Sequence, residues 1–177
     1  MVVIGSRRIS EYGKNVIDCL VPGLVKEGYT VVSGLAVGCD SYAMKSALDN
    51  GGKVVGVLGY GLNYISSDSN VKFIERVLAS ENGIIVSPFK RTESPSKHSF
   101  IYRNSIMAAI GRSVLVIEAQ RKSGVFYTVN FALELGRNIM AVPGDLFKFN
   151  SQGTHALIKE GAMLVDGLES VLESVEY

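Results

Sequence analysis

Loops rich in glycine, serine and arginine follow several of the apolar runs in this sequence. The residues concerned are Gly5, Ser6 and Arg7 after the first run and Ser33, Gly34 and Gly38 after the second. Glycine lets the backbone approach a ligand, serine and arginine donate to phosphate, and a helix that starts there directs free N–H groups at an anion. The pattern predicts a phosphate-binding crevice. The first loop alone also fits a turn that carries solvated arginines.

A basic segment with interleaved aromatic residues, 88–105, follows the fourth apolar run. Lys97 and Arg103 are among its cations and Phe100 is among its rings. Cations that track phosphates, together with rings that stack bases, are the composition of a single-strand nucleic-acid groove. A mobile, solvated lid is the other interpretation of this segment.

A second candidate anion site follows the fifth run. Ser123 and Gly124 open a helix there, with Arg121 and Lys122 beside them. The same run ends at Glu118, a position at which a lone carboxylate more often orients a neighbouring loop than takes part in chemistry. Several such helix starts with nearby cations indicate a crevice for more than one phosphate.

The sequence contains no recognisable catalytic, metal or cofactor pattern. His98 and His155 have neither metal-ligand nor triad spacing, and Cys39 has no histidine partner, so it fits a packed small residue better than a nucleophile. Asp40 fits dipole complementation in a first helical turn. The second loop departs from G-x-G-x-x-G, and no acid ends its strand to hold a ribose. We therefore expect no catalytic residue, no metal and no cofactor.

Short Val- and Ile-rich runs alternate with longer segments of helical periodicity. We expect strands at Val2–Gly5, Thr30–Ser33, Lys53–Leu58, Gly83–Ser87, Ser113–Glu118, Asn138–Val142 and Ala162–Val165. We expect helices at Glu11–Lys26, Cys39–Asn50, Ser69–Ser80, Ile101–Gly111, Val125–Leu135, Thr154–Lys159 and near Leu168–Ser174. Strict alternation predicts an α/β fold, with a mostly parallel sheet and helices on both faces. The ligand crevice of such a sheet lies at the carboxyl ends of its strands.

Composition limits the class of protein. The chain has 177 residues, of which 47% are hydrophobic and 20% charged, and this suits one globular domain. The net charge of the chain is only +1, so overall basicity does not indicate nucleic-acid binding. Any site for a polyanion therefore needs cations that are gathered on one face. The two cysteines, Cys19 and Cys39, form no disulfide framework, and neither a signal peptide nor a membrane span is recognisable. We expect a cytoplasmic protein.

Taken in order, these motifs resemble the DNA-processing protein A family (DprA, also called Smf). The matching segments are Gly5–Arg7, Ser33–Asp40, Gly61–Tyr64, Ser87, Phe100–Ala108, Ile117–Ala119, Ser123–Gly124, Thr128, Gly136–Arg137, Ala141–Gly144 and Gly153–Ala162. The match covers nearly the whole chain in order and spacing. The resemblance implies an extended Rossmann-like fold, single-stranded DNA binding, loading of a RecA-type recombinase during transformation, and a homodimer.

The resemblance also implies which residues meet DNA. Arg7 and the Gly34–Gly38 loop would contact phosphate, while Lys97, Arg103, Asn104 and the loop around Ser123–Gly124 would line the same groove. We expect one domain over residues 1–177, without the helical domain that often precedes this core or the winged-helix domain that often follows it.

The sequence departs from the family pattern at Ile65, Pro88, Ser105 and His155. Ser105 replaces an arginine and so removes one expected phosphate contact. A small-nucleotide binder, or a hydrolase resembling the LOG-type phosphoribohydrolases, is the alternative function. In that pattern Phe131 occupies the position of the reacting glutamate, and a phenyl ring cannot act as an acid or base. A scaffold that contacts a recombinase or a sister subunit is a third possibility.

Overall fold

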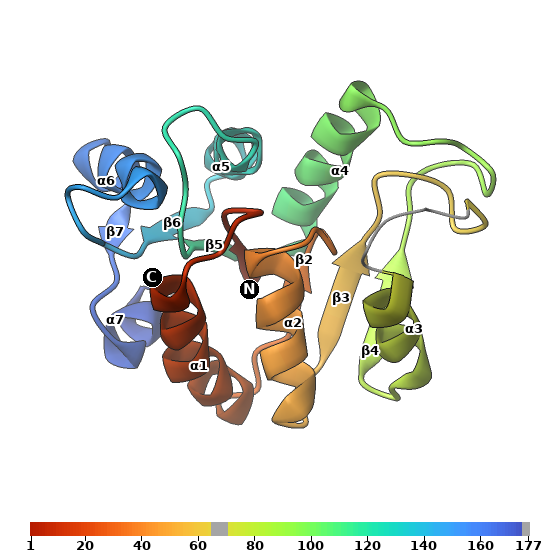
Figure 1. The fold of residues 1–177 in the computed structure, drawn as a ribbon, viewed down its shortest axis with the longest axis horizontal. Helices are drawn as coiled ribbons and strands as arrows, with labels where there is room; N and C mark the ends of the chain where they lie inside the picture. The colour runs from red at the N-terminus through yellow and green to blue at the C-terminus, as the bar shows by residue number, and fades with distance from the viewer. Residues whose placement is uncertain (65–70, 175–177) are drawn as a thin grey trace.

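The structure, a computed structural model, describes residues 1–64 and 71–174. Within these ranges the strands form one parallel sheet in the order β4-β3-β2-β1-β5-β6-β7 (Figure 1). The strands are β1 (Val2–Ile4), β2 (Val31–Ser33), β3 (Val54–Val57), β4 (Gly83–Val86), β5 (Ser113–Val116), β6 (Asn138–Ala141) and β7 (Met163–Leu164). The order reverses at β1, which pairs with β2 on one side and β5 on the other. This is the switch point at which open α/β sheets bind ligands.

Helices cover both faces of the sheet. They are α1 (Glu11–Lys26), α2 (Cys39–Asp49), α3 (Val71–Ala79), α4 (Lys97–Ile110), α5 (Val125–Glu134), α6 (Gln152–Lys159) and α7 (Leu168–Glu173), with a 3-10 turn, η1 (Phe149–Ser151), before α6. One apolar core joins the sheet to α1, α2, α3 and α7, and a second joins it to α4, α5 and α6. No helix among residues 1–64 and 71–174 is both long enough and apolar enough to cross a membrane.

The expected fold class and elements are confirmed, and the sheet is parallel at each of its six pairings. Strand and helix bounds agree within about two residues, with one exception. Ile65 and the first two residues expected for the third helix lie in 65–70, outside the described residues.

The start of α4 is the exception, because the helix begins at Lys97 and not at Ile101. Ser96 caps the helix: its hydroxyl accepts from the Ser99 N–H at 3.0 Å, and the Ser99 hydroxyl accepts from the Ser96 N–H at 2.9 Å. A reciprocal capping box of two serines satisfies the free N–H groups that otherwise fray a helix start. Lys97 and Phe100, expected on a loop, therefore lie on the first turn of α4.

Candidate nucleic-acid interface

A cavity of about 510 Å³ opens at the carboxyl ends of β1 and β5. Its walls come from the loops that follow these strands, from the segment between β2 and the first turn of α2, from one side of α4 and from the start of α5. Nine of the residues that the sequence predicts at the site line this cavity: Gly5, Ser6, Arg7, Lys97, Phe100, Arg103, Asn104, Ser123 and Gly124. Four segments far apart in the sequence thus meet at the switch point of the sheet.

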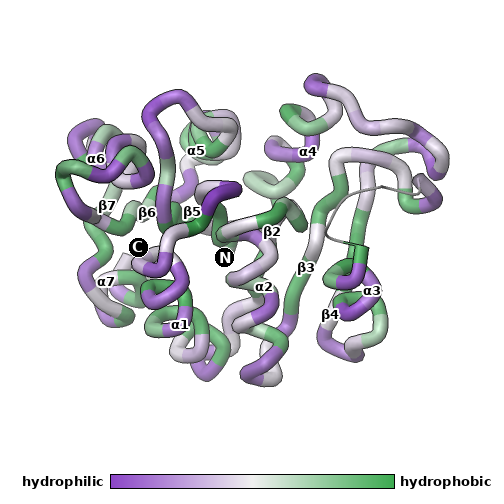
Figure 2. Tube along the Cα trace, viewed as in Figure 1, coloured by the Kyte–Doolittle hydropathy of each residue, from purple (hydrophilic) through white to green (hydrophobic). Residues whose placement is uncertain are grey.

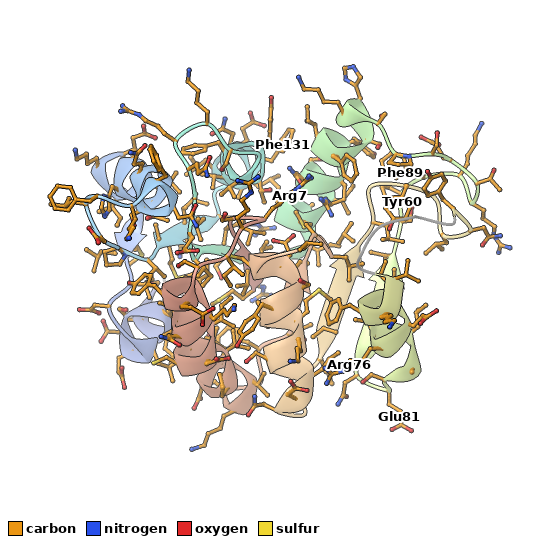
Figure 3. The ribbon with its side chains drawn as sticks, in the orientation of Figure 1. Arg7, Tyr60, Arg76, Glu81, Phe89 and Phe131 are labelled. Atoms are coloured by element: carbon orange, nitrogen blue, oxygen red, sulfur yellow. The ribbon has the colours of Figure 1, made fainter. Side chains whose placement is uncertain are left out.

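The cavity combines cations at its edge with apolar groups inside. Arg7 and Lys97 are exposed, and Arg7 extends into the gap between α4 and α5 (Figure 3). Phe100 and Met107 supply part of the apolar lining. Figure 2 shows hydrophilic residues at the tips of the loops after β1 and β5 and at the start of α4. Cations around an apolar recess suit a ligand that carries both phosphate and a flat ring.

Helical periodicity explains which residues of α4 reach the cavity. Lys97, Phe100, Asn104 and Met107 follow the i, i+3, i+7, i+10 spacing that places side chains on one face of a helix. Ser105 is not part of the lining, and its hydroxyl donates to the Tyr102 carbonyl at 2.7 Å. The serine at position 105 therefore removes a cation from the flank of α4 and not from the cavity wall.

Arg103 lines the cavity, but most of its guanidinium is committed within the protein. The side chain is buried, and Nη1 donates to the Val57 carbonyl at 2.9 Å and also to the Gly34 carbonyl. Asp40, also buried, faces it and accepts from the Gly34 N–H at 3.1 Å. Burial raises the pKa of the Asp40 carboxyl, and the Arg103 charge opposes that rise. The pair holds the loop after β2 in place.

Ser33, Gly34 and Gly38 are not among the lining residues, although Ala36 and Asp40 of the same segment are, so their contact with phosphate stays a prediction. The Ser33 hydroxyl is fully buried and donates to the Val3 carbonyl at 2.6 Å. A Cβ at Gly34 would collide with Arg103, and one at Gly38, where φ is +101°, would collide with the backbone of residues 6 and 7. Glycine at both positions permits close packing between loops of the protein.

Cys39, which follows this loop, is fully buried beneath Gly5. Burial raises the pKa of its thiol well above the ordinary value. Because the thiolate is the reactive form, Cys39 serves as a packed side chain. The sequence interpretation of Cys39 as a packing residue is confirmed.

Glu118 joins three loops around the cavity. Its carboxylate is buried and accepts from the Ser10 N–H at 3.0 Å, from the Ser10 hydroxyl and from Asn150 Nδ2 at 3.3 Å. Asn150 Nδ2 also donates to the Arg8 carbonyl at 2.9 Å. The carboxylate thus orients the loop that carries Arg7, as expected for a lone glutamate at a strand end.

The start of α5 supplies the remaining polar wall. The Ser123 hydroxyl oxygen is buried and has no hydrogen-bond partner among the described residues, and it lies in the cavity lining. Buried polar atoms are almost always paired, so an unpaired hydroxyl at a helix start marks a position for a ligand acceptor. Arg121 and Lys122 are exposed on the same loop but do not line the cavity.

Several lining residues were not identified from the sequence. They include Met107, Gln120 and Tyr127. The periodicity of α4, counted from its true start, points to Met107. Gln120 carries no local signal, because its position depends on how the loop after β5 folds back over the sheet.

Comparison with known proteins places the chain in a family. The sequence profile of DNA recombination-mediator protein A matches residues 1–176. The chain belongs to this family. The resemblance inferred from the motifs is therefore confirmed. Within the family, Protein Smf of Escherichia coli (strain K12) is 38% identical over 177 residues, which is 100% of this chain and 47% of that protein.

Two solved structures of DNA processing protein A share the fold. The X-ray structure from Streptococcus pneumoniae matches with a TM-score of 0.90 and 37% identity, over 99% of this chain and 61% of that one. The protein from Helicobacter pylori, described for its single-stranded DNA binding mode, matches with a TM-score of 0.87 and 28% identity, over 99% of this chain and 79% of that one. The chain spans about half to three-fifths of its curated relatives from Escherichia coli and Streptococcus pneumoniae, at 47% and 62%.

Proposed function

We propose that this domain binds single-stranded DNA in the cavity between α4 and α5 and performs no reaction itself. The observation that carries the proposal is the cationic edge around an apolar recess at the switch point of the sheet. Arg7 and Lys97 would neutralise phosphates, and Ser123 with the start of α5 would hold another. Phe100 would stack on a base. The Helicobacter pylori relative is described for its single-stranded DNA binding mode, and this supports the assignment.

The remaining expectations form part of the same proposal. The domain would act in the cytoplasm, help to load a RecA-type recombinase, and assemble as a homodimer. Apolar side chains are exposed along β7, which pairs only with β6 among the described strands. An uncovered apolar strand edge supports self-association.

The small-nucleotide alternative receives less support. Phe131, which occupies the position of the reacting glutamate in the LOG-type pattern, packs against the apolar core shared by α4, α5 and α6. Figure 3 shows it on α5. Nothing at this position can donate or accept a proton.

Parallel titrations test the proposal. Fluorescence anisotropy with labelled oligothymidylate should show binding that weakens with salt, with a log–log slope of about −0.7 for each phosphate neutralised. Thermal unfolding in the presence of a mononucleotide is the second measurement. Stabilisation by mononucleotide without binding of oligonucleotide favours the alternative. Binding of oligonucleotide that does not respond to salt contradicts the proposed phosphate contacts.

A further inference from the structure

A hydrogen-bonded loop between β6 and α6 holds three apolar side chains in water. Leu146, Phe147 and Phe149 are 77%, 91% and 74% exposed. Figure 1 shows the loop running from β6 along the outside of the sheet to α6, and Figure 2 shows its hydrophobic residues. Monomeric proteins rarely expose large contiguous apolar patches, so three such exposed side chains on one short loop indicate a contact surface.

The backbone of this loop is fixed by its own hydrogen bonds. The Asp145 carboxylate accepts from the Phe147 N–H at 2.8 Å, and the Asp145 carbonyl accepts from the Lys148 N–H at 3.1 Å. The Lys148 carbonyl in turn accepts from the Ser151 N–H at 3.1 Å. The exposed rings therefore extend from an ordered turn, and the acidic side chain of the turn is directed at its own backbone.

The loop is also joined to the wall of the cavity. The Asn150 carbonyl accepts from the Ala119 N–H at 2.7 Å, beyond the end of β5. Asn150 Nδ2 donates to the carbonyl of Arg8, a cavity-lining residue, at 2.9 Å. Asn150 thus places the aromatic loop and the arginine loop side by side at the carboxyl edge of the sheet. The loop is therefore attached to the part of the cavity wall that Arg8 forms.

The composition of the loop favours a polynucleotide over a protein. Lys148 stands between Phe147 and Phe149, so a cation accompanies two rings whose faces are open to solvent. Rings that stack on bases beside a cation that meets phosphate are the means by which single strands are held without sequence preference. We propose that residues 146–149 form a second stacking subsite for the same single-stranded DNA, holding bases that lie outside the cavity. This inference rests on the proposed function.

Oligonucleotide length separates the two subsites. Labelled oligothymidylates of about 6 and about 20 nucleotides are used, because single-strand binding folds occupy about 4–16 nucleotides and the longer one exceeds this range. The variant Phe147→Leu/Phe149→Leu keeps apolar bulk and removes both rings. We expect it to bind the short oligonucleotide as the wild type does and the long one about 5- to 50-fold more weakly. Its salt slope should be unchanged, and Phe147→Trp/Phe149→Trp should restore the affinity.

Lys148→Ala tests the cation separately. It should reduce the magnitude of the salt slope for the long oligonucleotide by about 0.7 and leave that for the short one unchanged. Leu78→Ala, at an exposed position on α3, is the matched control and should alter neither affinity.

Three results would overturn the inference. Unchanged affinity of the leucine variant for the long oligonucleotide excludes stacking, and an equal loss at both lengths assigns the rings to the cavity. A change of oligomeric state in sedimentation equilibrium makes the loop a protein contact. Failure of the wild type to bind either length is a different result, because it contradicts the proposed function and the second subsite with it.

Discussion

The two arginines expected to contact phosphate have different roles, one at the binding surface and one in the support of the fold. Arg7 is exposed at the cavity, whereas Arg103 is buried against Asp40 and two backbone carbonyls. Removing the buried Arg103 guanidinium leaves the Gly34 and Val57 carbonyls without their donor, while removing a surface cation costs little stability. The same substitution should therefore affect binding at one position and folding at the other.

We expect Arg103→Ala to lower the free energy of unfolding by about 2–6 kcal/mol, measured by urea denaturation, because two buried carbonyls lose their donor at about 1–3 kcal/mol each. Arg7→Ala should leave it within about 0.5 kcal/mol and reduce the magnitude of the DNA salt slope by about 0.7. Arg112→Ala is the control, because Arg112 is an exposed cation at the opposite end of β5. An unfolding curve for Arg103→Ala that matched the wild type would contradict the positioning role of Arg103.

At the scale of elements, Glu118 determines where the arginine loop lies. It holds the N-cap of α1 through Ser10 and the loop before α6 through Asn150. A glutamine can keep this arrangement, because its oxygen accepts from Ser10 N–H and Asn150 while its amide donates to the Ser10 hydroxyl. An alanine leaves buried donors unpaired, at a cost of about 1–3 kcal/mol each.

Glu118→Ala should accordingly weaken oligonucleotide binding and reduce the magnitude of the salt slope, since Arg7 is no longer held at the cavity. Glu118→Gln should retain both the affinity and the slope of the wild type. Salt titrations of the two variants, at a temperature where circular dichroism shows both folded, give the comparison. A glutamine variant as impaired as the alanine variant would indicate a role for the charge itself.

Elements were more predictable from the sequence than the contacts between their loops. The Val- and Ile-rich runs and their alternation with helical periodicity locate β1 to β7 because hydrophobic spacing is a local property. The start of α4 depends on reciprocal caps between Ser96 and Ser99, and a Pro–Ser–Lys segment does not reveal them. Gly34 and Gly38 were recognised as sites of close approach, but only the packed loops show that the approaching groups belong to the protein itself.

For the whole molecule, the β7 edge is one of the two edges at which the sheet ends among the described strands. Met163 and Leu164 are 44% and 47% exposed on a strand that pairs only with β6 among the described strands, and exposed Leu133 of α5 lines the same surface pocket as Met163. A two-fold axis beside such an edge would bury the same apolar patch from both copies. This geometry provides the test of the proposed homodimer.

Sedimentation equilibrium should show a dimer for the wild type and a monomer for Met163→Lys/Leu164→Lys, because charged lysines block pairing at strand edges. Leu78→Lys, at an exposed position on α3 beside the opposite edge, should leave the dimer intact. The cavity lies at the carboxyl ends of β1 and β5, away from β7 in the strand order, so the monomeric variant should bind a short oligonucleotide as the wild type does. A dimer that survives both lysines would place the interface elsewhere, and loss of short-oligonucleotide binding on dissociation would mean that the second copy completes the cavity.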